Sequence, residues 1–398
     1  MKVTSIDIFA LKPRYVAHTM RGIVCRINTD EGLYGYGEAA LSYGKGSMAG
    51  FHMIKELAPL IIGQDPMRTE YLWESMLKNT FWGVSGGAVF YAAMSAIDIA
   101  LMDIKGKALG VPCYQLLGGK QRDSLRAYAS QLQLGWMNDD DQGFKLQFTP
   151  EDYAREAEKA VKEGYTAIKT DFLAVDGKTK TVRPFDALTG ILDQETLRMG
   201  VERLRATREA VGPDVDIIVE NHGNTDAISG TQFGRAIETY NVYYYEEATN
   251  PLNPTTSKSV SNKVKIPIAN GERIFTRWKY LPFMLDDSIQ VIQPEISNCG
   301  GLTECKKICD LAHIFDAAVQ VHVCGSPISL AAALQVEAAI PNFLIHEHHV
   351  MNKMLFIREL GMYDMAPVNG SFIVPERPGI GQELSDYAIK TAYCETVK

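Results

Sequence analysis

Apolar and polar residues alternate along the first 40 positions in the manner of half-buried β-strands. Three stretches show this pattern, with a hairpin turn signal at residues 30–32 between the last two: Val3–Leu11, Gly22–Thr29 and Leu33–Glu38. From about residue 47 to 107 the apolar spacing becomes helical, most clearly in Phe90–Lys107. The pattern predicts an α+β domain over residues 1–124 that ends just after the Gly118-Gly119 turn signal.

Beyond residue 124, short apolar segments alternate with amphipathic ones. The predicted strands are Leu125–Ser130, Ala167–Phe172, Asp216–Asn221, Val242–Glu247, Pro267–Asn270, Val291–Pro294, Ala318–His322 and Phe343–Glu347. Helices fit between them, for example at Pro150–Glu163, Gln194–Val211, Thr225–Glu238, Leu302–Phe315 and Ile328–Ala339. Eight such units predict an α/β fold, a modified TIM-type (β/α) barrel over residues 125–374, with a doubly wound sheet as the alternative. We expect the tail, residues 375–398, to return to the first domain.

Composition excludes several classes of function. The chain has 398 residues, 46% of them hydrophobic, and a formal net charge of −8 without a basic block, so we expect no nucleic-acid binding. No apolar run approaches the roughly 20 residues that a membrane helix needs, and the N-terminus lacks the apolar core of a signal peptide. The seven cysteines are scattered without metal-binding spacing, which indicates reduced thiols and a cytoplasmic protein.

Ionisable side chains follow almost every predicted barrel strand. Active sites of TIM barrels lie at the carboxyl ends of the strands, so these residues should meet in one place. Carboxylates gathered there would repel one another and cost folding stability unless a cation compensated their charge. The ionisable residues at these strand ends are Lys169, Asp171, Glu220, His222, Glu246, Glu247, Glu272, Arg273, Glu295, His322 and Glu347.

Three of these carboxylates share a regular spacing. The interval from Glu220 to Glu246 and from Glu246 to Glu272 is 26 residues, one β/α unit each. The three side chains therefore project from consecutive strands. All-oxygen ligation favours one Mg²⁺, with Mn²⁺ possible, and no thiolate or imidazole cluster points to zinc. The alternative is that each glutamate is a solvated or ion-paired charge.

Two histidines accompany the predicted metal site. His222 follows Glu220 by two residues, which on a strand places both side chains on the same face. His322 ends the seventh strand beside Glu295, and a carboxylate bonded to a histidine fixes its tautomer and makes it a better base. A cation with imidazoles on opposite sides suits removal of a proton α to a carboxylate. A second imidazole near the β-carbon could protonate a departing hydroxyl, which would dehydrate a polyhydroxy acid to a 2-keto-3-deoxy acid.

Several longer segments carry a resemblance to a known family. They are TDEGLYGYGEA (29–39), SAIDIALMDIKGKALGVPCYQLLGG (95–119), VENHG (219–223), YYEE (244–247), NGERIFTR (270–277), IQPEISNCGGLTECKKI (292–308), VHVCGSPIS (321–329) and IHEHH (345–349). With them the chain resembles, nearly end to end, the mandelate racemase subgroup of the enolase superfamily, in particular acid-sugar dehydratases similar to D-galactonate dehydratase. The resemblance implies a barrel with an N-terminal capping domain, a small-molecule acid-sugar substrate and a homo-oligomer.

The resemblance also implies roles for individual residues. His322 with Glu295 would abstract the α-proton, and His222 would be the acid for the leaving hydroxyl. The metal ligands would be Glu220, Glu246 and Glu272. Glu347 would hydrogen-bond the enediolate, and capping loops at about residues 14–22 and 40–50 would close over substrate. The remaining candidate substrate contacts are Lys169, Arg21, Tyr43 and Lys45.

The chain departs from the subgroup at informative positions. Asp171 stands where racemases of this subgroup typically have the second lysine of Lys-x-Lys, which disfavours racemisation by two opposed bases. Glu295 replaces the usual aspartate of the dyad. Two long polar stretches, Asn138–Lys145 and Ala174–Thr189, are predicted rim loops that prevent transfer of the galactonate enzyme's substrate. A racemase, epimerase or cycloisomerase, or a weakly active metabolite-sensing homologue, therefore remain as alternatives.

Overall fold

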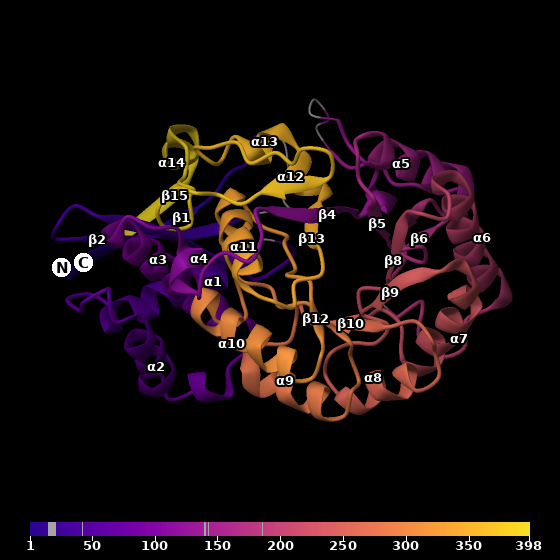
Figure 1. The fold of residues 1–398 in the computed structure, drawn as a ribbon, viewed down its shortest axis with the longest axis horizontal. Coiled ribbons are helices and arrows are strands. Elements are labelled where there is room, and N and C mark those ends of the chain that lie inside the picture. The colour runs from indigo at the N-terminus through magenta and orange to yellow at the C-terminus, as the bar shows by residue number, and fades with distance from the viewer. Residues whose placement is uncertain (15–20, 42, 139–140, 142, 185) are drawn as a thin grey trace.

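The computed structural model describes residues 1–14, 21–41, 43–138, 141, 143–184 and 186–398. Figure 1 shows two parts side by side, an N-terminal α+β domain that also holds the chain's last strand and a larger ring of helices around a sheet. Among the described residues, no helix combines the length and apolar character needed to cross a membrane.

The N-terminal domain is built on a four-stranded antiparallel sheet. Its order is β15-β1-β2-β3, so the C-terminal strand β15 lies beside the first strand β1. The strands are β1 (Val3–Ala10), β2 (Ile23–Thr29), β3 (Tyr34–Ala39) and β15 (Tyr393–Val397). The helices are α1 (Ser47–Leu57), α2 (Thr69–Asn79), α3 (Ala88–Leu109), α4 (Cys113–Leu116) and α14 (Asp386–Thr391). The predicted strands, hairpin and long helix are confirmed.

A glycine in β3 explains how closely this sheet packs on α3. A Cβ atom added at Gly37 would lie 2.0 Å from the carbonyl oxygen of Ala96, far inside contact distance. Only glycine lets the backbone of β3 approach the helix to this separation. The close approach at Gly37 therefore also positions the next residue, Glu38. Its side chain extends from the N-terminal domain toward the barrel.

The larger part is the predicted parallel barrel. Its strand order is β12-β11-β10-β9-β8-β5-β4-β13, and a parallel bridge from Val319 to Phe343 joins the two ends. A doubly wound sheet would reverse its strand order, so that alternative is wrong. The strands are β4 (Ser124–Ser130), β5 (Ala167–Thr170), β8 (Asp216–Glu220), β9 (Val242–Glu246), β10 (Ile268–Asn270), β11 (Val291–Ile292), β12 (Ala318–Val319) and β13 (His346–His349).

Helices surround this sheet in chain order (Figure 1). They are α5 (Pro150–Lys162), α6 (Gln194–Val211), α7 (Ala227–Ile237), α8 (Pro254–Ser261), α9 (Thr276–Leu285), α10 (Gly301–Ile314) and α11 (Pro327–Ala339). Smaller elements are β6 (Val175–Asp176), β7 (Thr181–Val182), β14 (Ser371–Ile373), α12 (Val350–Lys353), α13 (Leu355–Arg358) and 3₁₀ turns at Ala58–Leu60, Gly83–Ser85, Leu132–Leu134 and Glu238–Tyr240.

Alternating strand residues divide into two apolar layers. Those that face the helices join the large core, whereas those that face inward fill the barrel with one compact cluster. The inward cluster consists of Tyr128, Ala167, Ile218, Tyr244, Ala269, Val291 and Ile345. Because this plug closes the barrel interior, the strand-end residues beyond it form the floor of any site at the carboxyl ends.

Buried acids of the N-terminal domain hold the first turns of two barrel helices. The Glu38 carboxylate accepts hydrogen bonds from the backbone N–H groups of Ser326 and Ser329 at the start of α11, each 3.0–3.1 Å long. Asp98 on α3 accepts one of 2.9 Å from the N–H of Thr303 on α10. The first N–H groups of a helix have no partner within the helix, and their positive end favours a carboxylate. These contacts attach the N-terminal domain to the barrel.

We expect Glu38→Ala to lower the free energy of unfolding by about 2–4 kcal/mol, because it leaves buried N–H groups of α11 without an acceptor. Chemical denaturation measures the change. Glu56→Ala is the matched control, since Glu56 is exposed on α1 of the same domain, and we expect it to change stability by less than about 0.5 kcal/mol. Equal stabilities of the two variants would contradict this account of how the domains are joined.

Candidate active site

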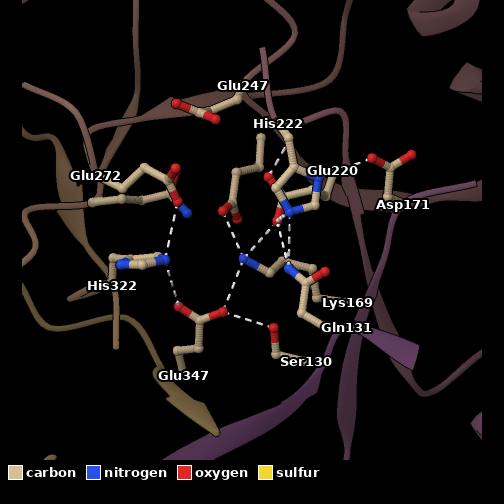
Figure 2. A network of polar contacts seen from close by, with 12 residues as sticks. Ser130, Gln131, Lys169, Asp171, Glu220, His222, Glu247, Glu272, His322 and Glu347 are labelled. Carbon is tan, nitrogen blue, oxygen red and sulfur yellow. Dashed lines mark hydrogen bonds and ion pairs between the residues drawn. The ribbon is translucent and has the colours of Figure 1, made fainter. Parts of the chain in front are cut away.

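Four strand-end side chains meet above the barrel plug with Lys169 at their centre. The Lys169 Nζ lies 2.9 Å from Glu220 Oε2, 2.6 Å from Glu246 Oε1 and 3.0 Å from Glu347 Oε1 (Figure 2). Glu220 and Glu246 are direct neighbours in the pairing of β8 with β9. All four residues are buried. Burial lowers the pKa of Lys169, but Glu220 and the other carboxylates outweigh it and hold the pKa well above its ordinary value. Lys169 is therefore an ammonium ion that compensates this cluster.

His322 lies at one side of the cluster with both ring nitrogens bonded to carboxylates. Its Nδ1 is 2.8 Å from Glu295 Oε2, and its Nε2 is 3.0 Å from Glu272 Oε2 and 3.8 Å from Glu347 Oε2. The Glu295 Oε1 accepts a 2.9 Å hydrogen bond from the N–H of Ser297, so the longer side chain is held in place. Burial lowers the pKa of His322, yet Glu272 and Glu347 raise it well above the usual value. Glu295 thus reaches the histidine despite replacing aspartate.

His222 lies on the opposite side of the cluster (Figure 2). Its Nδ1 is 2.9 Å from Asp171 Oδ2, and its Nε2 is 3.7 Å from Glu220 Oε2. The predicted reason for its position was wrong: β8 ends at Glu220, and His222 has a left-handed backbone with φ of 51° instead of a strand conformation. Burial lowers its pKa, but Glu220, Asp171 and Glu272 outweigh this effect and raise the pKa to about 10.

Glu247, the residue directly after β9, forms an ion pair with Arg273 that the sequence analysis did not predict. Glu247 is buried, and its Oε1 accepts a 3.1 Å hydrogen bond from Arg273 Nε. Arg273 also donates to the backbone carbonyl of His222 at 2.9 Å and lies 3.5 Å from Glu272. Burial and Glu272 raise the pKa of Glu247 to about 7 against the effect of Arg273. The sequence does contain a signal for this ion pair. Two adjacent acids end one strand, and an arginine directly follows Glu272 at the end of the next.

The carboxylate oxygens of the cluster fit a hard divalent cation, and the same side chains form ion pairs with Lys169 and His322. In the part of the chain that is described, no three histidine, cysteine, aspartate or glutamate side chains stand close enough to coordinate one ion. Glu220 and Glu246 contact Lys169, while Glu272 contacts His322. Among described atoms, the buried Oε2 of Glu246 has no hydrogen-bond partner. Burial and Glu220 raise the pKa of Glu246 well above its ordinary value and outweigh the opposite effect of Lys169.

The candidate residues of the N-terminal domain do not join the buried cluster. Arg21 is exposed, and Tyr43 keeps 70% of its surface exposed. The predicted loops around them include residues 15–20 and 42, which lie outside the described residues. The second loop begins next to the site, since the N–H of Ala40 donates a 2.8 Å hydrogen bond to the carbonyl of Ser297, two residues after Glu295. Substrate contacts from Arg21 and Tyr43 therefore stay predictions.

The two predicted rim loops differ in structure. In the first, residues 139, 140 and 142 lie outside the described part, and the N–H of Lys145 donates to the carbonyl of Leu134 at 2.8 Å. The second contains a small antiparallel hairpin, β6 with β7, that the sequence interpretation took for a loop. The N–H of Ala174, the residue before β6, donates a 2.7 Å hydrogen bond to Asp171 Oδ1, so the hairpin begins close to the site.

Comparison with known families decides the classification. Residues 152–388 match the family described as enolase C-terminal domain-like, and residues 10–118 match the mandelate racemase/muconate lactonizing enzyme N-terminal domain. This chain belongs to the enolase superfamily. Its members generally bind Mg²⁺ and use a lysine or histidine base. The family assigned from the sequence segments, and the capped barrel that it implied, are confirmed.

Individual relatives of this enolase superfamily member agree with the classification. A D-galactonate dehydratase from Verminephrobacter eiseniae is 32% identical over 393 residues, 97% of this chain and 93% of the relative. A D-xylonate dehydratase from Haloferax volcanii is 32% identical over 374 residues, 94% of this chain and 85% of the relative. The crystal structure of an enolase superfamily member from Salmonella Typhimurium superposes with a TM-score of 0.96 at 52% identity, over all of both chains. Both named dehydratases are hydro-lyases. This chain is likewise an enzyme.

Proposed function

We propose that this enzyme is a Mg²⁺-dependent dehydratase that converts a sugar acid, an aldonate or aldarate, to its 2-keto-3-deoxy product. One observation carries the proposal. Two histidines face a shared carboxylate cluster from opposite sides, each with its Nδ1 bonded to a buried acid, Glu295 in one case and Asp171 in the other. Such a pair can remove a proton on one side of a bound molecule and deliver one on the other. The names of the relatives support a sugar acid as substrate.

His322 and His222 would act on opposite sides of the bound substrate. In its neutral form His322 would accept the C2 proton at Nε2, while Glu295 stabilises the resulting imidazolium through Nδ1. His222 would donate a proton to the 3-hydroxyl, so that the C3–O bond breaks and water leaves. The resulting enol becomes the 2-keto acid when C3 takes a proton. Glu220, Glu246 and Glu272 would hold Mg²⁺, which when bound neutralises the charge that develops on the substrate carboxylate.

Two groups would support the substrate from the eighth and second strands. Glu347 lies within 3.8 Å of His322 Nε2 and would accept a hydrogen bond from a substrate hydroxyl on the side where the C2 proton leaves. Lys169 is 3.0 Å from Glu347 and keeps it ionised, since this ammonium lowers the pKa of Glu347 below its usual range. We propose Lys169 as a further substrate contact because its charge would attract an acid at the cluster.

Racemisation is the nearest alternative, and the second strand argues against it. The two-base route needs a lysine at residue 171, but Asp171 occupies that place and contacts His222. A metabolite-sensing homologue is the other alternative. The 2.8 Å contact between Glu295 and His322 disfavours it, because a broken dyad was the reason to consider it.

The test is a screen of aldonic and aldaric acids with the purified enzyme and Mg²⁺. We expect at least one acid to give a 2-keto-3-deoxy product, detected as its semicarbazone, and expect chelation by EDTA to stop the reaction. The variant Glu209→Gln, altered at an exposed position on α6, serves as the matched control and should keep full activity. C2 exchange without loss of water would favour the racemase, and binding without turnover across the panel would favour the sensor.

A further inference from the structure

Backbone hydrogen bonds hold the side chain of Asp171 in one orientation beside His222. Its side chain is buried, and its Oδ1 accepts hydrogen bonds from the N–H groups of Leu173 at 2.9 Å and Ala174 at 2.7 Å. These bonds close a turn directly after β5 and leave Oδ2 for His222 Nδ1, 2.9 Å away. The backbone therefore orients this carboxylate, and the carboxylate in turn orients the imidazole.

A glutamine side chain contacts the other ring nitrogen of His222. Gln131 Nε2 lies 3.3 Å from His222 Nε2 and donates a 3.1 Å hydrogen bond to Glu220 Oε2. Gln133 bonds to the Gln131 side chain and accepts from the N–H of Asp171 at 3.3 Å. The polar contacts thus form a closed path from Asp171 through both glutamines to the far side of the ring.

Among the described residues, Asp171 and Gln131 make the closest polar contacts with the His222 ring. Its side chain keeps 35% of its surface exposed, whereas that of His322 keeps 16% and contacts three carboxylates. Its backbone is left-handed and lies beyond the end of β8, so strand geometry does not set the direction of the imidazole. Asp171 is the charged group that contacts its Nδ1 among the described residues.

We infer that Asp171 is a positioning residue that aims His222 Nε2 at the departing hydroxyl and so determines whether the deprotonated substrate loses water or is reprotonated at C2. The inference rests on the proposed function and deepens it. Breakage of the C2–H bond sends the proton to His322, whose surroundings do not include Asp171. Only the later step, in which the C3–O bond breaks and the hydroxyl leaves as water with a proton from His222, requires the aimed imidazole.

The test compares wild type, Asp171→Asn, His222→Asn and the double variant in D₂O with Mg²⁺ and an acid that the wild type dehydrates. Asparagine keeps the oxygen that accepts from Leu173 and Ala174 but removes the carboxylate from Nδ1. We expect Asp171→Asn to lower kcat for dehydration at least about tenfold, with KM and Mn²⁺ binding within about threefold of wild type. Deuterium incorporation at C2 of unconverted substrate should continue, so the ratio of exchange to dehydration rises about tenfold or more.

The double variant separates positioning from a general structural effect. If Asp171 acts through His222, adding Asp171→Asn to His222→Asn causes no further loss of dehydration, because the two effects are not additive. Multiplicative losses, a parallel fall of exchange and dehydration, or an unchanged ratio would each overturn the inference. If Asp171→Asn fails to fold, Asp171→Ser provides the same comparison. Absence of both product and exchange in the wild type across the whole panel would overturn the proposed function itself and this inference with it.

Discussion

Replacement of His322 by asparagine is expected to lower dehydration by at least about 10³-fold, within the 10²–10⁴-fold range that general acid–base groups contribute. Asparagine removes the Nε2 atom that lies 3.0 Å from Glu272 Oε2 and would accept the C2 proton. Unlike Asp171→Asn, this change removes the first step, so deuterium exchange at C2 should disappear together with product. Rates of both processes, measured on the same sample by NMR, give the comparison.

Glu295 provides the matched controls for this prediction. Glu295→Gln leaves a side chain of the same length without the charge that stabilises the imidazolium, and we expect an intermediate loss, about 10–100-fold. Glu295→Asp restores the residue usual in the subgroup, but the shorter side chain would lengthen the present 2.8 Å contact with His322 Nδ1, and we expect a smaller loss. Full turnover by His322→Asn would contradict the assignment of the base.

The second large effect concerns the proposed metal ligands. We expect Glu246→Gln to weaken Mn²⁺ binding by more than about 100-fold, since loss of a ligand should exceed the 10–100-fold effects of its supporting groups. The variant removes a negative charge at a buried carboxylate whose Oε2 has no hydrogen-bond partner among the described atoms. Mn²⁺ binding, followed by electron paramagnetic resonance, measures the metal site apart from activity. Dehydration with Mg²⁺ should fall below detection.

Glu209→Gln, a change at an exposed position, tests whether loss of any carboxylate would weaken Mn²⁺ binding and turnover. Glu209 lies on α6, where its side chain pairs with Arg205, so its replacement should leave Mn²⁺ binding and turnover unchanged. Equal Mn²⁺ binding by Glu246→Gln and wild type would contradict the ligand assignment. The three ion pairs of Lys169 would then compensate the cluster without a metal ion.

The sequence predicts the barrel well because its strands are short, apolar and buried on both faces. Each of the eight predicted strands coincides with or overlaps an observed strand except for small shifts at the ends, such as Phe343–Glu347 against β13 at His346–His349. The family segments were equally informative, since Asp98 and Glu38 lie within them and hold barrel helices across the domain boundary. Strand ends could therefore be used to find the site.

What the sequence interpretation missed lies beyond the strand ends, where no periodicity applies. Asp171 was placed at a strand end, but its role was interpreted only as that of a missing lysine. Its contact with His222 depends on a left-handed backbone that no alternation pattern reveals. Gln131, also left-handed with φ of 70°, is uncharged and directly follows β4. Ionisable residues alone were considered at the strand ends, so this amide was passed over.

The most direct test of the central claim is the proton NMR spectrum of the product formed in D₂O with Mg²⁺ from an acid identified by the screen. Loss of the C2 proton, departure of the 3-hydroxyl and uptake of one proton at C3 predict a 2-keto-3-deoxy acid with a single deuterium at C3. The same sample with EDTA should show unchanged substrate. Deuterium at C2 of an intact or epimerised sugar acid, with no 3-deoxy product, would contradict the dehydratase assignment.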